Sequence, residues 1–171
     1  MRSLAQEFIE QSIYRIEENT TKLFSCFEEL SEEDIWRRPN ESSNSIGNII
    51  LHLCGNIRQY AISSLGNKTD TRERAKEFAA RGGYTKEELK TKLTETVNEA
   101  IETIKKTDEN SLLRVRSVQD YTMTGTAIII HVTEHYSYHT GQVIFWTKLL
   151  KNKGFSFYET VDLNQKNKIA E

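Results

Sequence analysis

The chain has 171 residues, with 23 lysines and arginines against 25 aspartates and glutamates and a net charge of −2. This balance gives no electrostatic basis for binding nucleic acid or an anionic membrane surface. No apolar run approaches the ~20 residues of a membrane span, and the acidic, periodic N-terminus is unlike a signal peptide. Two cysteines, Cys26 and Cys54, without a C-x-x-C motif favour reduced thiols, so we expect a cytoplasmic protein.

A single proline and eight glycines favour a helical chain. The first helix is predicted over residues 4–30, where apolar residues recur in alternating steps of four and three, with Thr20 as the one polar interruption. The polar segment 31–43, which contains Pro39, ends this pattern. A second helix is predicted from an N-cap at Ser45 to near Gly66.

Residues 67–84 are predicted to form a long polar crossover with one short helix. We interpret the charge run in residues 69–77 as a solvated face, with Arg72 and Arg74 able to meet an anionic ligand. A capping box, Thr85 to Glu88, predicts a third helix through about residue 106. Residues 107–123 are irregular, although the alternation in residues 112–123 allows a short extended piece.

The fourth helix is predicted from about residue 124 to 152, with Gly154 as its stop. Four long helices, with one long crossover between the second and third, predict an all-α four-helix bundle. We assign residues 1–154 to this bundle and residues 155–171 to a polar C-terminal tail. We assign packing roles to four aromatic residues, Trp36, Tyr138, Phe145 and Trp146.

Three of the four histidines, His131, His135 and His139, follow one another at intervals of four on the fourth predicted helix. Neighbours at this spacing can reach a single ion, whereas His131 and His139 are about 12 Å apart along the axis, which is too far. The pair is therefore His131/His135 or His135/His139, and the helical wheel leaves both open. Polar residues, Thr140 among them, lie nearly opposite this stripe, so we predict that the histidines face the bundle interior.

The fourth histidine, His52, lies at the edge of the apolar arc of the second helix, close to Asn48 and Asn56. A third imidazole from a neighbouring helix would give three ligands and one open position, which is the catalytic arrangement for zinc-like metals. Cys54 points away from His52, and we interpret it as a packing residue. The alternative is that the histidines are hydrogen-bonded core residues without a metal.

Two known metal motifs fit poorly. Residues 131–135 match H-x-x-E-H, the inverted zinc-peptidase pattern, but Glu134 falls on the polar side of the helix. A ferritin-like di-iron site needs a glutamate three residues before each histidine, and this chain has none there.

The sequence from Ser45 to Asn56 (SIGNIILHLCGN) and that from His135 to Gln142 (HYSYHTGQ) together resemble the DinB/YfiT-like superfamily of metalloenzymes. The resemblance spans roughly residues 5–152 and implies a four-helix bundle, a homodimer and a divalent metal such as zinc or nickel. It implies His52, His135 and His139 as the ligands and leaves His131 outside the first coordination shell. The family usually has arginine where this chain has Thr140.

The resemblance also implies an activity, the transfer or isomerisation chemistry of low-molecular-weight thiols such as bacillithiol. We therefore expect a metal-dependent thiol S-transferase acting on a small-molecule thiol and an electrophile. The alternatives are a metal-dependent hydrolase, which needs a nearby carboxylate that the motif does not provide, and a non-catalytic helical module that binds metal or dimerises. Neither nucleic acid nor a membrane is expected as a partner.

Overall fold

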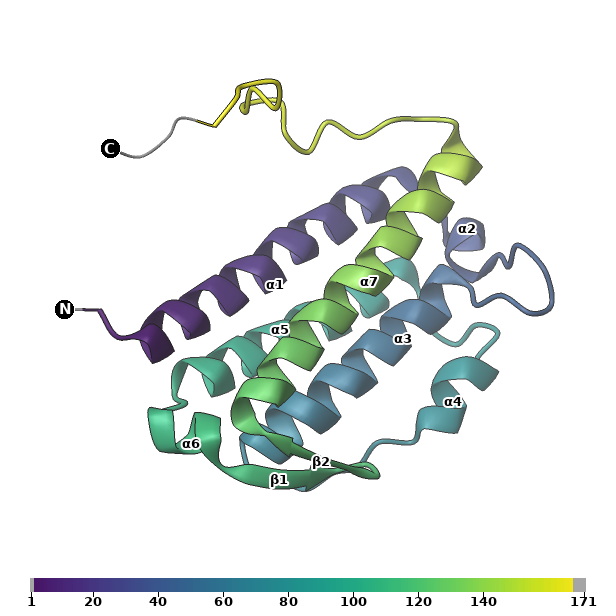
Figure 1. Ribbon diagram of the computed structural model, residues 1–171. Helices are drawn as coiled ribbons and strands as arrows, with labels where there is room; N and C mark the ends of the chain where they lie inside the picture. The colour runs from purple at the N-terminus through teal and green to yellow at the C-terminus, as the bar shows by residue number, and fades with distance from the viewer. Residues whose placement is uncertain (1, 168–171) are drawn as a thin grey trace.

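The computed structural model describes residues 2–167 and confirms the predicted four-helix bundle (Figure 1). The long helices are α1 (Leu4–Glu29), α3 (Ile46–Ile57) with its continuation η1 (Arg58–Leu65), α5 (Lys86–Lys105) and α7 (Gly125–Lys151). Three short helices, α2 (Glu32–Trp36), α4 (Arg74–Ala79) and α6 (Glu109–Leu113), and two strands, β1 (Val115–Val118) and β2 (Tyr121–Thr124), lie in the connections. Within the described residues, no helix combines the length and the apolarity that crossing a membrane requires.

The helices begin where their capping residues predict. Ser45 and Thr85 each accept a hydrogen bond from the backbone N–H three residues later, and Asn48 and Glu88 complete the two capping boxes. The second helix reaches Leu65 as predicted, but its last eight residues form a π-helix, which the sequence did not reveal. The fourth helix ends at Lys151, and its C-cap Asn152 adopts a left-handed conformation with φ 47°, so the prediction of Gly154 as the stop was wrong.

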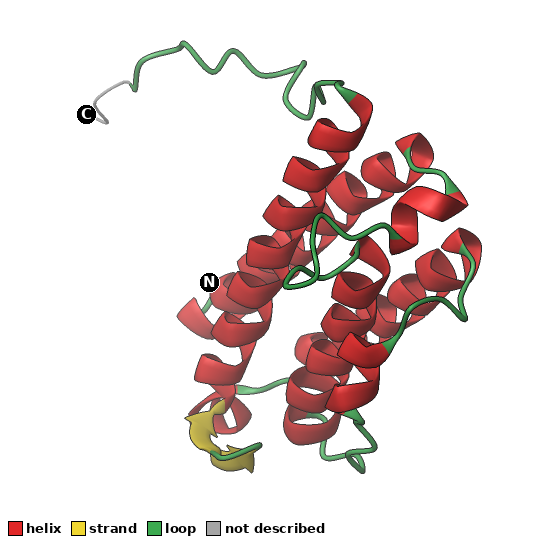
Figure 2. Ribbon diagram, turned by 90° about the vertical axis from the view of Figure 1, so that its right-hand side faces the viewer, coloured by secondary structure: helices red, strands yellow, loops and turns green. Residues whose placement is uncertain are grey.

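The predicted extended piece in residues 112–123 is an antiparallel hairpin. Val118 pairs with Tyr121, so Gln119 and Asp120 form the turn, with Gln119 at φ 52°. Figure 2 shows these strands at one end of the bundle, where α7 begins. The Tyr60 hydroxyl donates to Gln119 Oε1 at 2.9 Å and fastens the hairpin turn to η1.

The buried face of α7 differs from the predicted one. Thr140 and Thr147 are almost fully buried, and each hydroxyl donates to the backbone carbonyl four residues earlier. Thr140 and Thr147 therefore share the buried face of α7 with apolar residues such as Val143. His135 and His139 are half-buried and lie at the edge of this face, toward α3, instead of in the centre of the interior.

The aromatic predictions were half right. Trp36 and Trp146 pack against the core. Tyr138 and Phe145 are 64% and 68% exposed, so their assignment to packing within this chain was wrong.

The C-terminal segment after α7 contains no helix or strand through residue 167. Phe155 packs against the core, and the Tyr158 hydroxyl accepts a 2.8 Å hydrogen bond from Lys22 on α1. The part of the predicted tail beyond residue 167 lies outside the described residues. The division at residue 154 stays a prediction.

Asp34 links α2 to the last turn of α7 and should make folding sensitive to acid. The hydrogen bond from the Lys151 ammonium lowers the pKa of Asp34, and the hydrogen bonds from Ser31 lower it further. Together they outweigh burial, which raises this pKa, and bring it to about 2 from a usual 3.8. A carboxylate whose pKa is lower in the folded state than in the unfolded state stabilises the fold at pH values above its unfolded-state pKa. This stabilisation is lost as the pH falls through the folded-state pKa. We expect Asp34→Asn to cost about 2 kcal/mol at pH 7, with the difference from the parent shrinking between pH 4 and pH 2.

Urea unfolding across this pH range measures the effect of Asp34→Asn. The matched control is Asp120→Asn in the exposed hairpin turn, where neutralisation should change stability by less than about 0.5 kcal/mol. A difference that stays constant down to pH 2 would contradict the assignment to this ion pair.

Candidate metal centre

The antiparallel packing of α3 against α7 decides which histidines meet. His52 on α3 lies opposite His135, and Asn56, one turn further along α3, lies opposite His131, one turn earlier on α7. Moving one turn toward the C-terminus of α3 therefore corresponds to moving one turn toward the N-terminus of α7. His52 therefore meets the later histidines of α7 instead of His131.

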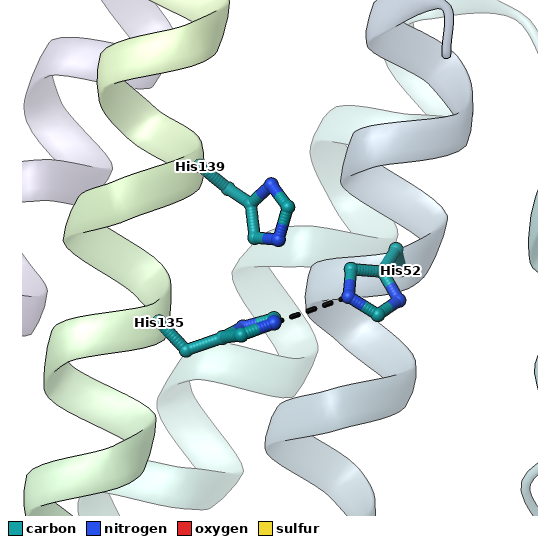
Figure 3. A group of neighbouring side chains, drawn as sticks. All are labelled: His52, His135 and His139. Atoms are coloured by element: carbon teal, nitrogen blue, oxygen red, sulfur yellow. Dashed lines mark hydrogen bonds between the residues drawn. The ribbon is translucent and has the colours of Figure 1, made fainter. Parts of the chain in front are cut away.

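His52, His135 and His139 form a cluster within metal-binding distance (Figure 3). His52 Nε2 and His135 Nε2 are 3.1 Å apart, and the candidate ligand nitrogens of all three residues lie within 4.8 Å of one another. Nitrogens bound at about 2.1 Å to a tetrahedral ion are about 3.4 Å apart, so small side-chain adjustments would suffice. Among residues 2–167, this is the one cluster of three or more potential ligand side chains at such distances.

His52 is oriented by a carboxylate that the sequence analysis missed. Its Nδ1 lies 3.0 Å from Glu77 Oε2. Arg72 Nη2 also lies 3.1 Å from this Nδ1, but the same Nη2 donates to Glu77 Oε2 at 2.8 Å. Because a carboxylate only accepts hydrogen bonds, we assign Nδ1–H as a second donor to Glu77, which leaves the lone pair on Nε2 toward His135. A carboxylate behind a ligating histidine fixes the tautomer and raises its basicity.

Glu77 is held in turn by Arg72. The Arg72 Nε donates to Glu77 Oε1 at 2.7 Å and its Nη2 donates to Oε2 at 2.8 Å. Burial alone would raise the pKa of Glu77, but the hydrogen bonds from Arg72 and His52 outweigh it and lower this pKa below its usual value. A deprotonated carboxylate is therefore stable behind His52.

This ion pair corrects the interpretation of the crossover as a solvated face. The side chains of Arg72 and Glu77 are 3% and 9% exposed. Gly55 allows them to pack on α3, because a Cβ at this position would lie 1.9 Å from Glu77 Oε1. In the sequence, the one sign of this packing is Gly55 itself, three residues after His52, because a glycine within a helix can allow another segment to approach closely.

His139 has its own orienting partner, Gln142, one turn later on α7. Their Nδ1 and Oε1 atoms are 2.8 Å apart. The amide oxygen accepts from Nδ1–H, which leaves Nε2 free for a ligand. Thr140, by contrast, is turned into the core and away from the triad.

His135 is the member of the triad whose second ring nitrogen lacks a hydrogen-bond partner. Its Nδ1 is buried without a hydrogen-bond partner. Burial, reinforced by the neighbouring imidazoles, lowers the pKa of His135 to about 3, and burial also lowers the pKa of His139. Both imidazoles are therefore neutral at pH 7, the state that binds metals.

His131 lies outside the triad. Its Nε2 is 3.1 Å from Asn56 Nδ2, and its ring stacks on Tyr60 with centroids 4.1 Å apart. Burial lowers its pKa, so it too is a neutral imidazole with a hydrogen-bond partner.

A cavity of about 410 Å³ adjoins the triad. Its lining residues are His52, Asn56, Tyr60, Arg72, Arg74, Gln119, Tyr121, Met123, His131 and His135. They come from α3, η1, the crossover, the hairpin and α7, and none is an aspartate or glutamate. This volume falls within the usual range of small-molecule sites.

The two cysteines do not belong to this site. Burial raises the pKa of Cys26 and of Cys54 to about 11, so neither is a thiolate at neutral pH. Cys54 lines a different cavity, between α3 and the other face of the crossover, which agrees with its predicted direction away from His52.

Fold and site together define a helical-bundle protein with a three-histidine cluster between two antiparallel helices. The chain belongs to the DUF1572 family, described as a protein of unknown function, whose family model matches residues 3–162. The search of curated proteins finds no match.

Two solved structures share the fold and confirm the resemblance to DinB-like proteins. The DinB-like protein YjoA from Bacillus subtilis is 17% identical, covering 86% of this chain and 97% of its own, with a TM-score of 0.67. A DinB-like protein from Bacillus cereus is 14% identical, covering 88% and 95%, with a TM-score of 0.68. At these identities the likeness concerns the fold.

Proposed function

We propose that this protein is a divalent-metal-dependent enzyme in which His52, His135 and His139 hold the metal, with zinc or nickel as the candidates. The observation that carries the proposal is the convergence of three imidazole nitrogens, two of them oriented by a hydrogen bond at Nδ1. A bound ion of this kind acts as a Lewis acid that lowers the pKa of a coordinated thiol. Three protein ligands leave one coordination position for such a thiol.

The residues around the triad have separable tasks. Glu77 holds the His52 tautomer, Gln142 holds that of His139, and Arg72 keeps Glu77 charged. The neutral state of His135 lets this site form at neutral pH without the loss of a proton from that ring.

Thiol transfer is the reaction type that we favour over hydrolysis. Activation of water usually involves a general base within reach of the reacting atom. Glu77 accepts from His52 Nδ1, on the side of the ring away from the triad, and no carboxylate lines the adjoining cavity. A low-molecular-weight thiol does not need such a base when its own pKa is lowered.

Metal analysis and a thiol panel test the proposal. The purified protein, stripped and reloaded, should bind one zinc or nickel ion per chain, and the loaded form should transfer a small-molecule thiol to an electrophile faster than the stripped form. A chain that takes up no metal would refute the proposal. Metal uptake without turnover on any thiol would leave the non-catalytic alternative.

We also propose that two copies associate through α7. Tyr138, Phe145 and Leu149 are exposed on this helix, and no atom lies within 4 Å of a Cβ built at Gly141. Gly141 therefore does not serve a close approach of helices within the part of the chain that the structure describes. Sedimentation at about twice the 19.8 kDa chain mass would support a homodimer, and a 19.8 kDa species would exclude it at the concentration measured.

A further inference from the structure

The cavity beside the triad has an uneven charge distribution. Its lining includes two arginines and no carboxylate, but Arg72 is neutralised by Glu77. Arg74 is exposed and forms no hydrogen bond or ion pair with any described side chain. The uncompensated positive charge of this cavity therefore belongs to Arg74.

Arg74 is held close to the triad by a cation–π contact. Its guanidinium lies over the Phe78 ring, 4.8 Å from the centroid, and Phe78 packs against His52 with centroids also 4.8 Å apart. This cation–π contact uses none of the guanidinium N–H donors in a hydrogen bond, so they stay available for a ligand. Arg74 can therefore bind a planar anion while its position relative to His52 is kept.

Other polar groups of the cavity have unused hydrogen-bonding capacity. Asn56, 4% exposed, has its Oδ1 buried without a partner, and the Tyr121 hydroxyl bonds no described residue. Gln119, by contrast, has a partner at both polar atoms, because its Oε1 accepts from Tyr60 and its Nε2 donates to Gln59. The cavity thus offers a cation and a hydroxyl at its rim and an unmatched acceptor deeper inside.

We propose that this cavity binds a small molecule carrying a carboxylate, which Arg74 and Tyr121 bind at the rim while the rest of the molecule reaches toward the triad. A guanidinium binds a carboxylate through parallel hydrogen bonds, which also fixes the ligand's orientation. The unpartnered Asn56 Oδ1 selects a ligand with an N–H or O–H donor between its ends. The direction toward the triad rests on the proposed metal function, whereas anion binding at Arg74 does not.

The first experiment uses the metal-free protein. Succinate and its neutral analogue succinamide are titrated while the backbone amide NMR signals of Arg74, Gln119 and Tyr121 are followed. Succinate should shift these signals, succinamide should bind at least roughly tenfold more weakly, and Arg74→Gln should remove the preference. The matched control is Arg114→Gln, an equal charge change at an exposed arginine outside the cavity lining, which should leave the preference intact.

The second experiment uses cobalt-loaded protein, in which a bound thiol gives a charge-transfer absorption band. Mercaptosuccinate should produce this band at a concentration at least roughly tenfold lower than neutral thioglycerol, and Arg74→Gln should make the two thiols equal.

The two experiments separate the two proposals. Succinate binding that depends on Arg74, in a protein that takes up no cobalt, would retain the anion site and refute the metal function. The opposite outcome has three parts: the protein takes up cobalt, both thiols bind equally, and Arg74→Gln leaves the succinate shifts unchanged. This outcome would overturn the anion site and retain the metal function.

Discussion

Replacing His135 with alanine should lower the affinity of the protein for zinc by at least roughly 100-fold. His135 contributes one of three nitrogens, and loss of a group that merely orients a ligand already costs 10–100-fold. His52→Ala and His139→Ala should have effects of the same order. Competition with a chromophoric zinc chelator measures these affinities.

The matched control is His131→Ala, which removes an imidazole from the same helix, one turn before His135. Because His131 bonds Asn56 and stacks on Tyr60, its loss should change zinc affinity by less than about threefold. Equal losses in His131→Ala and His135→Ala would show that the triad has been assigned wrongly. Circular dichroism of each variant separates the loss of a ligand from the loss of the fold.

Glu77→Gln should both destabilise the fold and weaken metal binding. The substitution leaves the Arg72 charge buried without its counter-ion, and breaking a buried ion pair in this way costs about 3–5 kcal/mol. The amide also ceases to support the His52 tautomer as strongly, so zinc affinity should fall about 10–100-fold. Urea unfolding of the metal-free protein measures the first effect and zinc competition the second.

Two further variants define the role of Glu77. In Arg72→Gln/Glu77→Gln both buried charges are gone, so the free energy of unfolding should recover part of the loss seen in Glu77→Gln. Glu73→Gln neutralises an exposed carboxylate of the same segment that pairs with Lys76, and it should cost less than about 1 kcal/mol. Lower stability with unchanged zinc affinity would mean that Glu77 stabilises the fold and does not support the metal centre.

Much of the helical architecture could be predicted because its causes are local. The apolar spacing in residues 4–30 and the caps at Ser45, Thr85 and Thr124 act within a few residues, so α1, α3, α5 and α7 begin within a residue or two of the predicted positions. The π-helical turns after Ile57 and the buried threonines of α7 were not predictable in this way. A threonine hydroxyl that donates to its own helix backbone can be buried. The polarity of Thr140 therefore led to the wrong prediction that its side of α7 faces solvent.

The candidate site was predicted in part. The spacing of the three α7 histidines predicted that two of them could share an ion but left open which two, and the resemblance to DinB-like proteins supplied His52, His135 and His139. Glu77 and Arg72 were missed as supporting residues. In the sequence they belong to a charged crossover, and nothing local distinguishes them from the exposed Glu73 and Lys76 beside them.

The sequence by itself therefore determined the four long helices, the balance of charge and the presence of several imidazoles in register on one helix. Only the tertiary structure decided the antiparallel register of α3 against α7, which brings His52 to His135 and Asn56 to His131. It also decided that the crossover folds back over Gly55 and buries Glu77 behind His52. The physical reason is that helix formation depends on neighbours within one or two turns, whereas the site depends on contacts between residues 25 to 87 positions apart, which only the packing of whole helices establishes.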